Sequence, residues 1–321
     1  MTHHRKWLTT GLVALLSLGV SAVATPAAAA GGRGGAVQAW GLDEYGEASA
    51  IPPELGSGVT ALSAGSYHNG YAIKHGRVYV WGNDDYGQVT TVPPALREGG
   101  VSAVTGGGAT GYAIKGGKLY AWGYDESGEV SSLPATLREG GVSAVAGGYG
   151  TGYALKAGKL YAWGDDEFGQ VSGVPRTLRE GGVTAIAAGT KTGYALKNGK
   201  VYAWGNDEYG QVSTLPRAEL SSGVSTIAAG YGTGYAIRRG KLHAWGDDQY
   251  GQVSTLPATL RQGGVTAIAA GYDNGYALKN GKVYAWGFDE FGQVSNIPAN
   301  LGSGVTAIAA GGFTAYALKA C

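Results

Sequence analysis

The stretch YAWGNDEYGQVSTLP, residues 202–216, decides the fold because near-copies of it recur along the whole chain. Each copy contains a Trp-Gly pair, and every pair follows the previous one by 41 residues, with the tryptophans at Trp40, Trp81, Trp122, Trp163, Trp204, Trp245 and Trp286. A fixed period of this length is typical of a repeat architecture built from one supersecondary unit. The 321-residue chain is therefore predicted to be an array of seven similar units.

Each unit contains four short strand-like segments. In the unit that ends with the quoted stretch they are VTAIAAG, GYALK, KVYAWG and QVSTLP, beginning at Val183, Gly193, Lys200 and Gln211. The second and third segments flank Asn198-Gly199, a preferred hairpin turn because both central positions take a positive φ. Equivalent turns recur at His75-Gly76, Gly116-Gly117, Ala157-Gly158, Arg239-Gly240 and Asn280-Gly281. Four strands in about 40 residues are typical of a β-propeller blade, and the lack of a sustained helical period excludes an α-solenoid.

The two ends of the repeat array complement each other. After residue 30 the sequence begins with a third segment, AVQAWG, and it finishes with a second segment, YALKAC. Residues 305–310 and 316–319 would supply the first two strands of one blade, and residues 36–40 and 47–51 the last two. We therefore predict an all-β, seven-bladed β-propeller closed by pairing of the N- and C-terminal strands, which also hides sheet edges. The apolar residues common to the units are predicted to form its core, in one unit Ile186, Ala187, Tyr194, Leu196, Tyr202 and Trp204.

The first 30 residues have the composition of a targeting segment. A basic start, MTHHRKW, precedes the apolar run LTTGLVALLSLGVSAVA and the small residues TPAAAA. This order predicts a secretory signal peptide, residues 1–30, cut near Ala30, with an uncleaved membrane anchor as the alternative. A propeller of residues 31–321 would then be secreted and free of the membrane. Because Cys321 is the one cysteine, no intrachain disulfide forms, and we expect a monomer, or a dimer linked through Cys321.

Composition and motifs argue against an enzyme. The formal net charge of +1 implies no general attraction to polyanions, and the chain has no HExxH, no CxxC and no phosphate-cradling glycine loop. Of the three histidines after residue 30, His68, His75 and His243, the last two lie in a hairpin turn and a strand and have no nucleophile near them in the sequence. The spacing of the acidic residues is not that of an EF-hand or of the nonapeptide calcium repeat. We predict a non-enzymatic protein without a cofactor or a metal.

Charge is divided between the two faces of such a propeller. Alternating strand directions place the loop after the first segment and the turn after the third on one face, called here the loop face. The turns, called here the acidic turns, hold 15 of the 23 acidic residues and lie at residues 42–45, 83–86, 124–127, 165–168, 206–209, 247–250 and 288–291. Most basic residues fall on the opposite face, so the loop face would steer a basic partner toward itself and would repel nucleic acid.

Two features of the acidic turns are predicted to be scaffold. Each turn is followed by Gly-Gln or Gly-Glu. The second residue of each turn is always Asp, a residue that commonly bonds its own backbone in tight turns, and it occurs at Asp43, Asp84, Asp125, Asp166, Asp207, Asp248 and Asp289.

The loops between the first and second segments, called here the variable loops, differ most between units. They read YHNG, GATG, YGTG, TKTG, YGTG, YDNG and GFTA at residues 67–70, 108–111, 149–152, 190–193, 231–234, 272–275 and 312–315. Unlike loops on a constant scaffold usually carry recognition. The predicted partner-binding residues come from both loops and turns and are Tyr45, Tyr67, His68, Tyr86, Tyr149, Asp165, Glu167, Phe168, Lys191, Tyr209, Tyr231, Tyr250, Tyr272, Asp273, Phe291 and Phe313.

The unit AIAAGxxxGYALKNGKVYAWGxDExGQ resembles the regulator-of-chromosome-condensation repeat, whose family forms seven-bladed propellers, and the likeness extends over residues 31–321. More narrowly, the 41-residue period, the phrase SGVTAIAAG, the VP or LP endings and the signal peptide resemble the secreted propeller-type β-lactamase inhibitory proteins of actinomycetes. This resemblance implies an inhibitor that covers the active-site entrance of a class A β-lactamase, or of a related penicillin-binding protein, with a ring of aromatics and a few aspartates.

The narrower resemblance fits the acidic turns better than the variable loops. By position it carries the variable-loop aromatics onto His68, Ala109, Gly150, Lys191, Gly232, Asp273 and Phe313, of which only Phe313 is a bulky hydrophobic anchor. Tyrosines stand one residue earlier, at Tyr67, Tyr149, Tyr231 and Tyr272, and the acidic turns match in type at Tyr45, Asp165, Phe168, Tyr209 and Tyr250. Aromatic hot spots each contribute about 2 kcal/mol or more to binding, so these departures bear directly on the target.

The pattern favours two functions, and a scaffold for the envelope proteins of the producing organism is a third option. An inhibitor uses one asymmetric footprint, which the unlike variable loops favour. A glycan-binding or cell-envelope-associated module uses several equivalent sites, which the similar acidic turns, each with Asp and most with an aromatic, favour.

Overall fold

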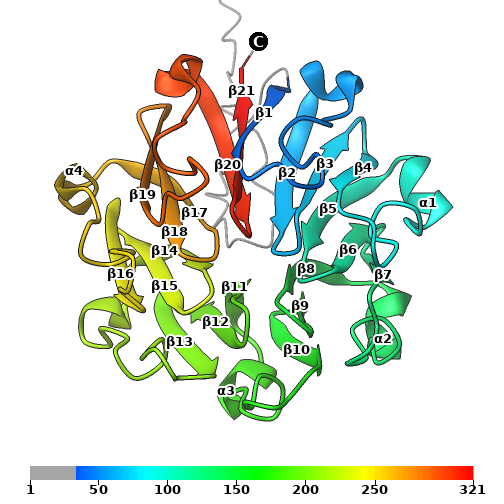
Figure 1. Cartoon of the computed structure of the whole chain (residues 1–321). Helices are drawn as coiled ribbons and strands as arrows, with labels where there is room; N and C mark the ends of the chain where they lie inside the picture. Colours follow the sequence, from blue (N-terminus) through cyan, green and yellow to red (C-terminus); the bar gives the residue numbers. More distant parts are fainter. Residues whose placement is uncertain (1–33, 321) are drawn as a thin grey trace, which may run out of the picture.

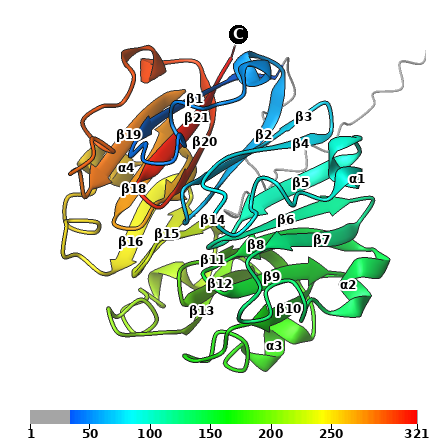
Figure 2. The same cartoon turned by 45° about the vertical axis from the view of Figure 1, so that its right-hand side comes forward.

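The computed structural model describes residues 34–320, so the predicted signal peptide, residues 1–30, and Cys321 lie outside the described residues. Within this part the chain forms seven three-stranded antiparallel sheets, arranged as blades around a common centre (Figure 1). Figure 2 shows the same ring from an oblique direction, with neighbouring sheets packed face to face. The predicted seven-bladed all-β propeller is therefore confirmed.

Each blade consists of an inner, a middle and an outer strand. Blade 1 contains β2 (Val59–Gly65), β3 (Asn69–Lys74) and β4 (Arg77–Gly82); blade 2 contains β5 (Val101–Gly106), β6 (Thr110–Lys115) and β7 (Lys118–Gly123); blade 3 contains β8 (Val142–Gly147), β9 (Thr151–Lys156) and β10 (Lys159–Gly164). Blade 4 contains β11 (Val183–Ala188), β12 (Thr192–Lys197) and β13 (Lys200–Gly205); blade 5 contains β14 (Val224–Ala229), β15 (Thr233–Arg238) and β16 (Lys241–Gly246); blade 6 contains β17 (Val265–Ala270), β18 (Asn274–Lys279) and β19 (Lys282–Gly287).

Blade 7 joins the two ends of the array. It contains β20 (Val305–Gly311), β21 (Thr314–Lys319) and, as its outer strand, β1 (Ala36–Gly41). The register places Ala36 opposite Lys319 and Gly41 opposite Thr314, and Figure 1 shows the blue β1 beside the red β21. Closure by the terminal strands is confirmed.

Short helices in the linkers between blades cover the outer strands and were not predicted. They are α1 (Pro94–Arg97), α2 (Ala135–Glu139), α3 (Arg176–Arg179), α4 (Ala258–Gln262), η1 (Pro53–Gly56), η2 (Glu219–Ser221) and η3 (Ala299–Gly302). Each packs on the outer strand that precedes it and buries one leucine, such as Leu178 in α3. Helices of three to five residues are too short to produce a helical hydrophobic period.

The predicted fourth strand of each blade is wrong. Residues 211–214 form a turn and residues 215–216 are irregular, and in the equivalent segment of blade 7 residues 47–49 form a turn and residues 50–51 are irregular. The amides of Val212 and Ser213 donate to the Asp207 carboxylate, both at 2.8 Å, and the amide of Thr214 donates to the Gly210 carbonyl at 2.9 Å. Since these amides are satisfied locally, they are not available for a sheet ladder.

Both central residues of the β12–β13 hairpin have positive φ, as predicted: 54° at Asn198 and 70° at Gly199. The other predicted hairpin turns share this conformation, including His75 and Ala157, each at 51°.

The repeated tryptophan joins neighbouring blades. In all seven copies the indole N–H donates to the backbone carbonyl of the Gln or Glu that follows the acidic turn of the preceding blade, at 2.9–3.0 Å. In five blades that carbonyl also accepts a hydrogen bond from the blade's own buried middle-strand tyrosine, such as Tyr194, whose ring packs edge-on against the next tryptophan, Trp245. The predicted core role of Trp204 and Tyr194 is confirmed, since both are buried.

Candidate loop-face interaction site

The variable loops and the acidic turns lie on the same face, as predicted. In every blade the first amide of the acidic turn donates to a carbonyl of the variable loop at 2.8–3.1 Å; for example, Asn206 donates to Lys191 in blade 4. Several variable loops are also bonded to the next one around the ring, because Tyr149 donates to Thr190 and Tyr272 donates to Gly312. The backbone of the loop face is therefore a connected and preorganised surface.

The aspartates repeated in the acidic turns hold the turns together, as predicted. Each accepts hydrogen bonds at one carboxylate oxygen from the amides five and six residues later, at 2.7–3.0 Å. At Asp166 the bond from the Ser172 amide is the main cause that holds the pKa of the carboxyl below its ordinary value of 3.8. These carboxylates are committed to the scaffold.

The Gln or Glu after each turn also stabilises that turn. Its side-chain oxygen accepts a hydrogen bond from the fourth amide of the turn in all seven blades, at 2.7–2.9 Å. The side chains are almost completely buried, as Gln170 and Glu47 illustrate.

Aromatic side chains gather on the loop face. Seven large hydrophobic side chains in the described part are 39–44% exposed, and all seven belong to this face and to the predicted binding set: Tyr45, Tyr86, Tyr149, Phe168, Tyr231, Tyr250 and Phe291. Single exposed hydrophobic residues are ordinary, but their concentration on one face is typical of an interaction surface. Of the other predicted aromatics, Tyr67, Tyr209, Tyr272 and Phe313 are partly buried.

These aromatics form two contacting runs. The first crosses blades 7, 1 and 2, where the Tyr45 ring contacts His68 at 5.2 Å and the Tyr67 ring contacts Tyr86 at 5.7 Å between centroids. The second run crosses blades 4 to 7, with centroid separations of 4.8–6.1 Å along Tyr209, Tyr231, Tyr272, Phe313, Phe291, Phe288 and Tyr250.

Sequence reasoning missed two members of these runs. Tyr124 packs on Tyr86 at 4.7 Å, and Phe288 packs on Tyr250 at 4.8 Å. Both occupy the first position of an acidic turn, where four other turns have Asn or Asp. That departure from the repeat was the available signal.

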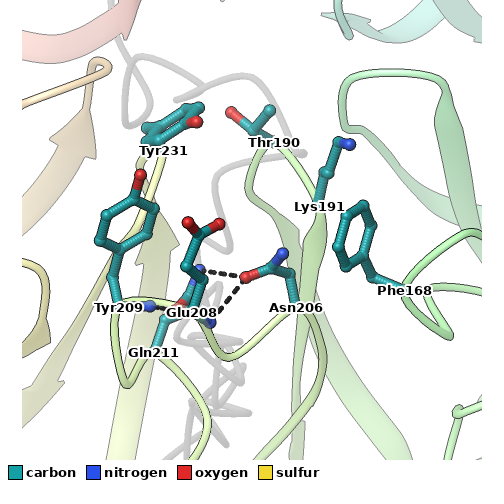
Figure 3. A pocket seen from close by; sticks show the side chains of 8 residues that line it. All are labelled: Phe168, Thr190, Lys191, Asn206, Glu208, Tyr209, Gln211 and Tyr231. Atoms are coloured by element: carbon teal, nitrogen blue, oxygen red, sulfur yellow. Dashed lines mark hydrogen bonds between the residues drawn. The ribbon is translucent and has the colours of Figure 1, made fainter.

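The side chain of Lys191 lies between blades 3 and 4. The ammonium of Lys191 lies 4.1 Å from the centroid of the Phe168 ring and 3.0 Å from the Glu167 carboxylate. Figure 3 shows Phe168 and Lys191 on one side of a small hollow, with Tyr209 and Tyr231 on the other. The hollow has a volume of about 70 Å³. The predicted residues Glu167, Phe168 and Lys191 are thus brought together.

The second residue of several variable loops contacts the Gln or Glu that follows the acidic turn of the preceding blade. His68 Nδ1 lies 3.1 Å from the buried Glu47 carboxylate, and the Asp273 carboxylate accepts a hydrogen bond from Gln252 at 3.3 Å. Burial, and secondarily the charge of Asp247, raises the pKa of Asp273. Asp165 is partly structural, because it accepts hydrogen bonds from the Glu167 amide and the Gln170 side chain.

Two negative findings concern the described residues. Between residues 34 and 320 no three or more His, Cys, Asp or Glu side chains are grouped so as to hold a metal ion. None of the helices in that part is both long and apolar enough to span a membrane.

The comparisons with known proteins agree with the repeat and the fold. Residues 183–211 match the regulator of chromosome condensation (RCC1) repeat. No curated protein sequence matches the chain. Among solved structures, Prp20p from Saccharomyces cerevisiae is similar with a TM-score of 0.69, 15% identity and 92% of each chain covered. Human WBSCR16 is similar with a TM-score of 0.71, 17% identity, and 90% of this chain and 100% of that chain covered.

A second structure of the yeast protein, bound by Kap60, gives a TM-score of 0.70 at 17% identity and covers 100% of this chain and 97% of that one. Likenesses at these identities establish the fold. The chain is thus a closed seven-bladed β-propeller, and residues 183–211, in blade 4, match the regulator of chromosome condensation repeat that the sequence resembles.

Proposed function

We propose that this protein is a secreted, non-enzymatic propeller that binds another protein through its loop face. The observation that carries the proposal is the concentration of all seven exposed large hydrophobic side chains of the described part on that face. Aromatic residues surrounded by polar groups are typical of protein interfaces. The acidic turns around them favour a partner with a basic contact surface.

The partner we propose is a class A β-lactamase or a related penicillin-binding protein, bound so that its active-site entrance is covered. The acidic-turn residues that match the inhibitor resemblance, such as Tyr45, Phe168 and Tyr250, are exposed and available for contact. In the variable loops the tyrosines that stand one residue early join the aromatic run, because Tyr231 contacts Tyr209 and Tyr272 contacts Phe313. They supply anchors where the carried-over positions have none.

The test is hydrolysis of a chromogenic β-lactam by a panel of class A β-lactamases, with and without the purified protein. We expect inhibition at nanomolar protein. Replacement of Phe168 or Tyr209 by Ala should weaken it by at least tenfold each, which corresponds to about 1.4 kcal/mol. Lys118→Ala is the control, because Lys118 is exposed beside the Gly116-Gly117 hairpin, at the opposite end of its strand from the loop face. No inhibition at micromolar protein would exclude these enzymes as targets.

The alternative function is glycan binding, and one observation favours it. The acidic turns repeat the same carboxylate geometry in all seven blades, and five of them present an exposed Tyr or Phe. A glycan array with the purified protein, competed by simple sugars, tests it. Saturable binding at several equivalent sites, unaffected by Phe168→Ala alone, would favour this function over inhibition.

A further inference from the structure

The loop face is hollowed above blade 2. The hollow has a volume of about 250 Å³, and its walls include the rings of Tyr67, Tyr86, Tyr124 and Tyr149. It exists because four surrounding positions carry small residues: Gly108 and Ala109 in the variable loop of blade 2, Ser127 in its acidic turn, and Gly150 in the loop of blade 3. The other six acidic turns have Tyr or Phe at the position of Ser127.

The walls are rings packed edge to face. Tyr86 and Tyr124 are 4.7 Å apart at an interplanar angle of 67°, and Tyr67 and Tyr86 are 5.7 Å apart at 64°. Rings at such angles to one another form the sides of a cage. Because the face of an aromatic ring carries negative charge density, such a cage attracts cations.

The hollow is also lined by carboxylates. Glu126 and Asp165 lie at its wall, and Glu129 lines it although only 1% of that residue is exposed. One carboxylate oxygen of Glu129 accepts a hydrogen bond from the Ser127 amide at 2.9 Å. In residues 34–320 no cationic side chain forms an ion pair with Glu129. Burial is the main cause that raises the pKa of this carboxyl, as expected for an acid held without a counter-ion.

Another blade of this chain shows which kind of side chain can pair with such a glutamate. Glu47 is the equivalent residue after the acidic turn of blade 7, and it is equally buried. Its partner is His68, 21 residues later in the next variable loop, at 3.1 Å. The residue 21 positions after Glu129 is Gly150, which has no side chain. The hollow is therefore the place where blade 3 would supply a side-chain partner for the glutamate and does not.

A second comparison on the same face shows the complete arrangement. Lys191 of blade 4, at the position equivalent to Gly150, places its ammonium on the Phe168 ring at 4.1 Å and beside Glu167 at 3.0 Å. Ring, carboxylate and cation are all present there. Above blade 2 the rings and carboxylates are present, and the cation is missing.

We propose that the hollow above blade 2 is a binding site for a cationic side chain, lysine or arginine, of the protein partner, with Glu129 as its counter-ion and the rings of Tyr86 and Tyr124 against its stem and head. This assignment rests on the proposed protein-binding function of the loop face. It adds the chemistry of one anchor, a basic residue inserted into an aromatic pocket.

The experiment titrates the full protein, labelled with ¹³C in its tyrosine rings, with Nα-acetyl-lysine amide and Nα-acetyl-arginine amide, which stand for the two side chains. Tetramethylammonium distinguishes a free quaternary cation, and Nα-acetyl-norleucine amide is the neutral control. We expect saturable shifts of the Tyr86 and Tyr124 ring signals with the lysine or arginine probe and none with the norleucine probe. Equal shifts with norleucine, or preference for tetramethylammonium over both amino-acid probes, would overturn the proposal.

Two variants test the role of Glu129. Glu129→Gln places there the residue that five other blades already have, so the fold should be retained and probe affinity should fall at least tenfold. Glu47→Gln is the matched control and should leave probe binding unchanged. Gly150→His should also remove probe binding by supplying an internal partner, since its φ of 74° is close to the 61° of His68. Unchanged affinity in Glu129→Gln would overturn the assignment.

The outcome is separable from the proposed function. The probes need no protein partner, so the hollow can bind cations even if every β-lactamase of the panel is unaffected. Conversely, an inhibited β-lactamase whose inhibition is unchanged by Glu129→Gln would uphold the loop-face function and reject the hollow as a partner anchor.

Discussion

At the scale of the residue, the carboxylates of the loop face have three different situations. Those like Asp166 accept two backbone hydrogen bonds and are scaffold. Glu167 is paired with a cation of the chain itself, Lys191. Glu129 is buried, accepts a hydrogen bond from the Ser127 amide, and forms no ion pair with a side chain of residues 34–320. An acidic side chain on this face thus stabilises a turn, pairs with a lysine of the chain, or is left to bind a cation of a partner, depending on its neighbours.

Loss of one scaffold carboxylate should weaken the fold in a pH-dependent way. Asp166→Ala should lower the free energy of unfolding at pH 7 by about 1 kcal/mol, because two backbone amides at the surface exchange a carboxylate for water. The folded pKa of Asp166 lies below its ordinary value of 3.8. The stabilisation is therefore present above that value and is lost as the pH falls through the folded pKa. Urea denaturation at pH 7 and pH 3 measures it, and an equal loss at both pH values would contradict the carboxylate's role.

Glu129→Gln should have the opposite effect on stability. Burial raises the pKa of Glu129 in the folded protein above its ordinary value of 4.5, so ionisation of this group costs the folded state more than the unfolded state. The variant should be more stable than the parent at pH 7, and the gain should disappear as the pH falls below the ordinary value. Thermal denaturation at pH 7 and pH 3.5 is the measurement, and a variant less stable than the parent at pH 7 would contradict it.

At the scale of the element, hairpin turns and acidic turns were not equally predictable. The conformation of the Asn198-Gly199 turn could be predicted, because few residue pairs tolerate two positive φ values. The segment after Gly210 alternates apolar and polar residues as a strand does, and this alternation led to the wrong prediction of a fourth strand. Leu215 is buried by a turn that the Asp207 carboxylate organises, so the pattern came from packing of single residues and not from a pleat.

The hairpin turn at Ala157 can be made more stable by one substitution. Ala157 holds φ at 51° with a methyl group, whereas the equivalent turns at residues 198 and 280 have Asn. Left-handed backbone costs an ordinary L-residue about 1 kcal/mol, and Asn tolerates it better. Ala157→Asn should raise the free energy of unfolding by up to about 1 kcal/mol, and Asn198→Ala should lower it by a similar amount. Chemical denaturation of both variants checks the pair; a change of the same sign in both would exclude this explanation.

At the scale of the molecule, the sequence predicted the number of blades and their closure better than the site. The tryptophan period fixes seven units because each indole bonds the preceding blade, so losing the period would break a junction. The structure places the predicted aromatic side chains on one face, and their role in binding stays a prediction. That Gly150 leaves Glu129 without the partner that His68 gives Glu47 could not be predicted, because it requires knowing which loop leans on which turn.

Closure of the ring should depend on the tryptophan of the first strand. Trp40 donates to the Gln293 carbonyl of blade 6, while its strand β1 pairs with β21 in blade 7 and Gly35, just before it, forms a bridge to Val59 of blade 1. Trp40→Phe should lower the free energy of unfolding by about 2 kcal/mol through a lost hydrogen bond and a small cavity. Hydrogen exchange of residues 36–41 should accelerate in this variant but not in Trp204→Phe, which makes the same change between blades 3 and 4. Equal exchange in the two variants would show that Trp40 does not hold the closing strand.

The seven tryptophan bonds have a consequence for how such a surface can change over evolutionary time. Every junction uses an indole and a backbone carbonyl at equivalent positions of the two blades. A 41-residue cassette moved from one place in the chain to another would therefore meet neighbours that it already fits, while bringing a different loop to the surface. Recombination between near-identical units could reorder the contact residues without redesigning any blade, so specificity and stability can diverge independently.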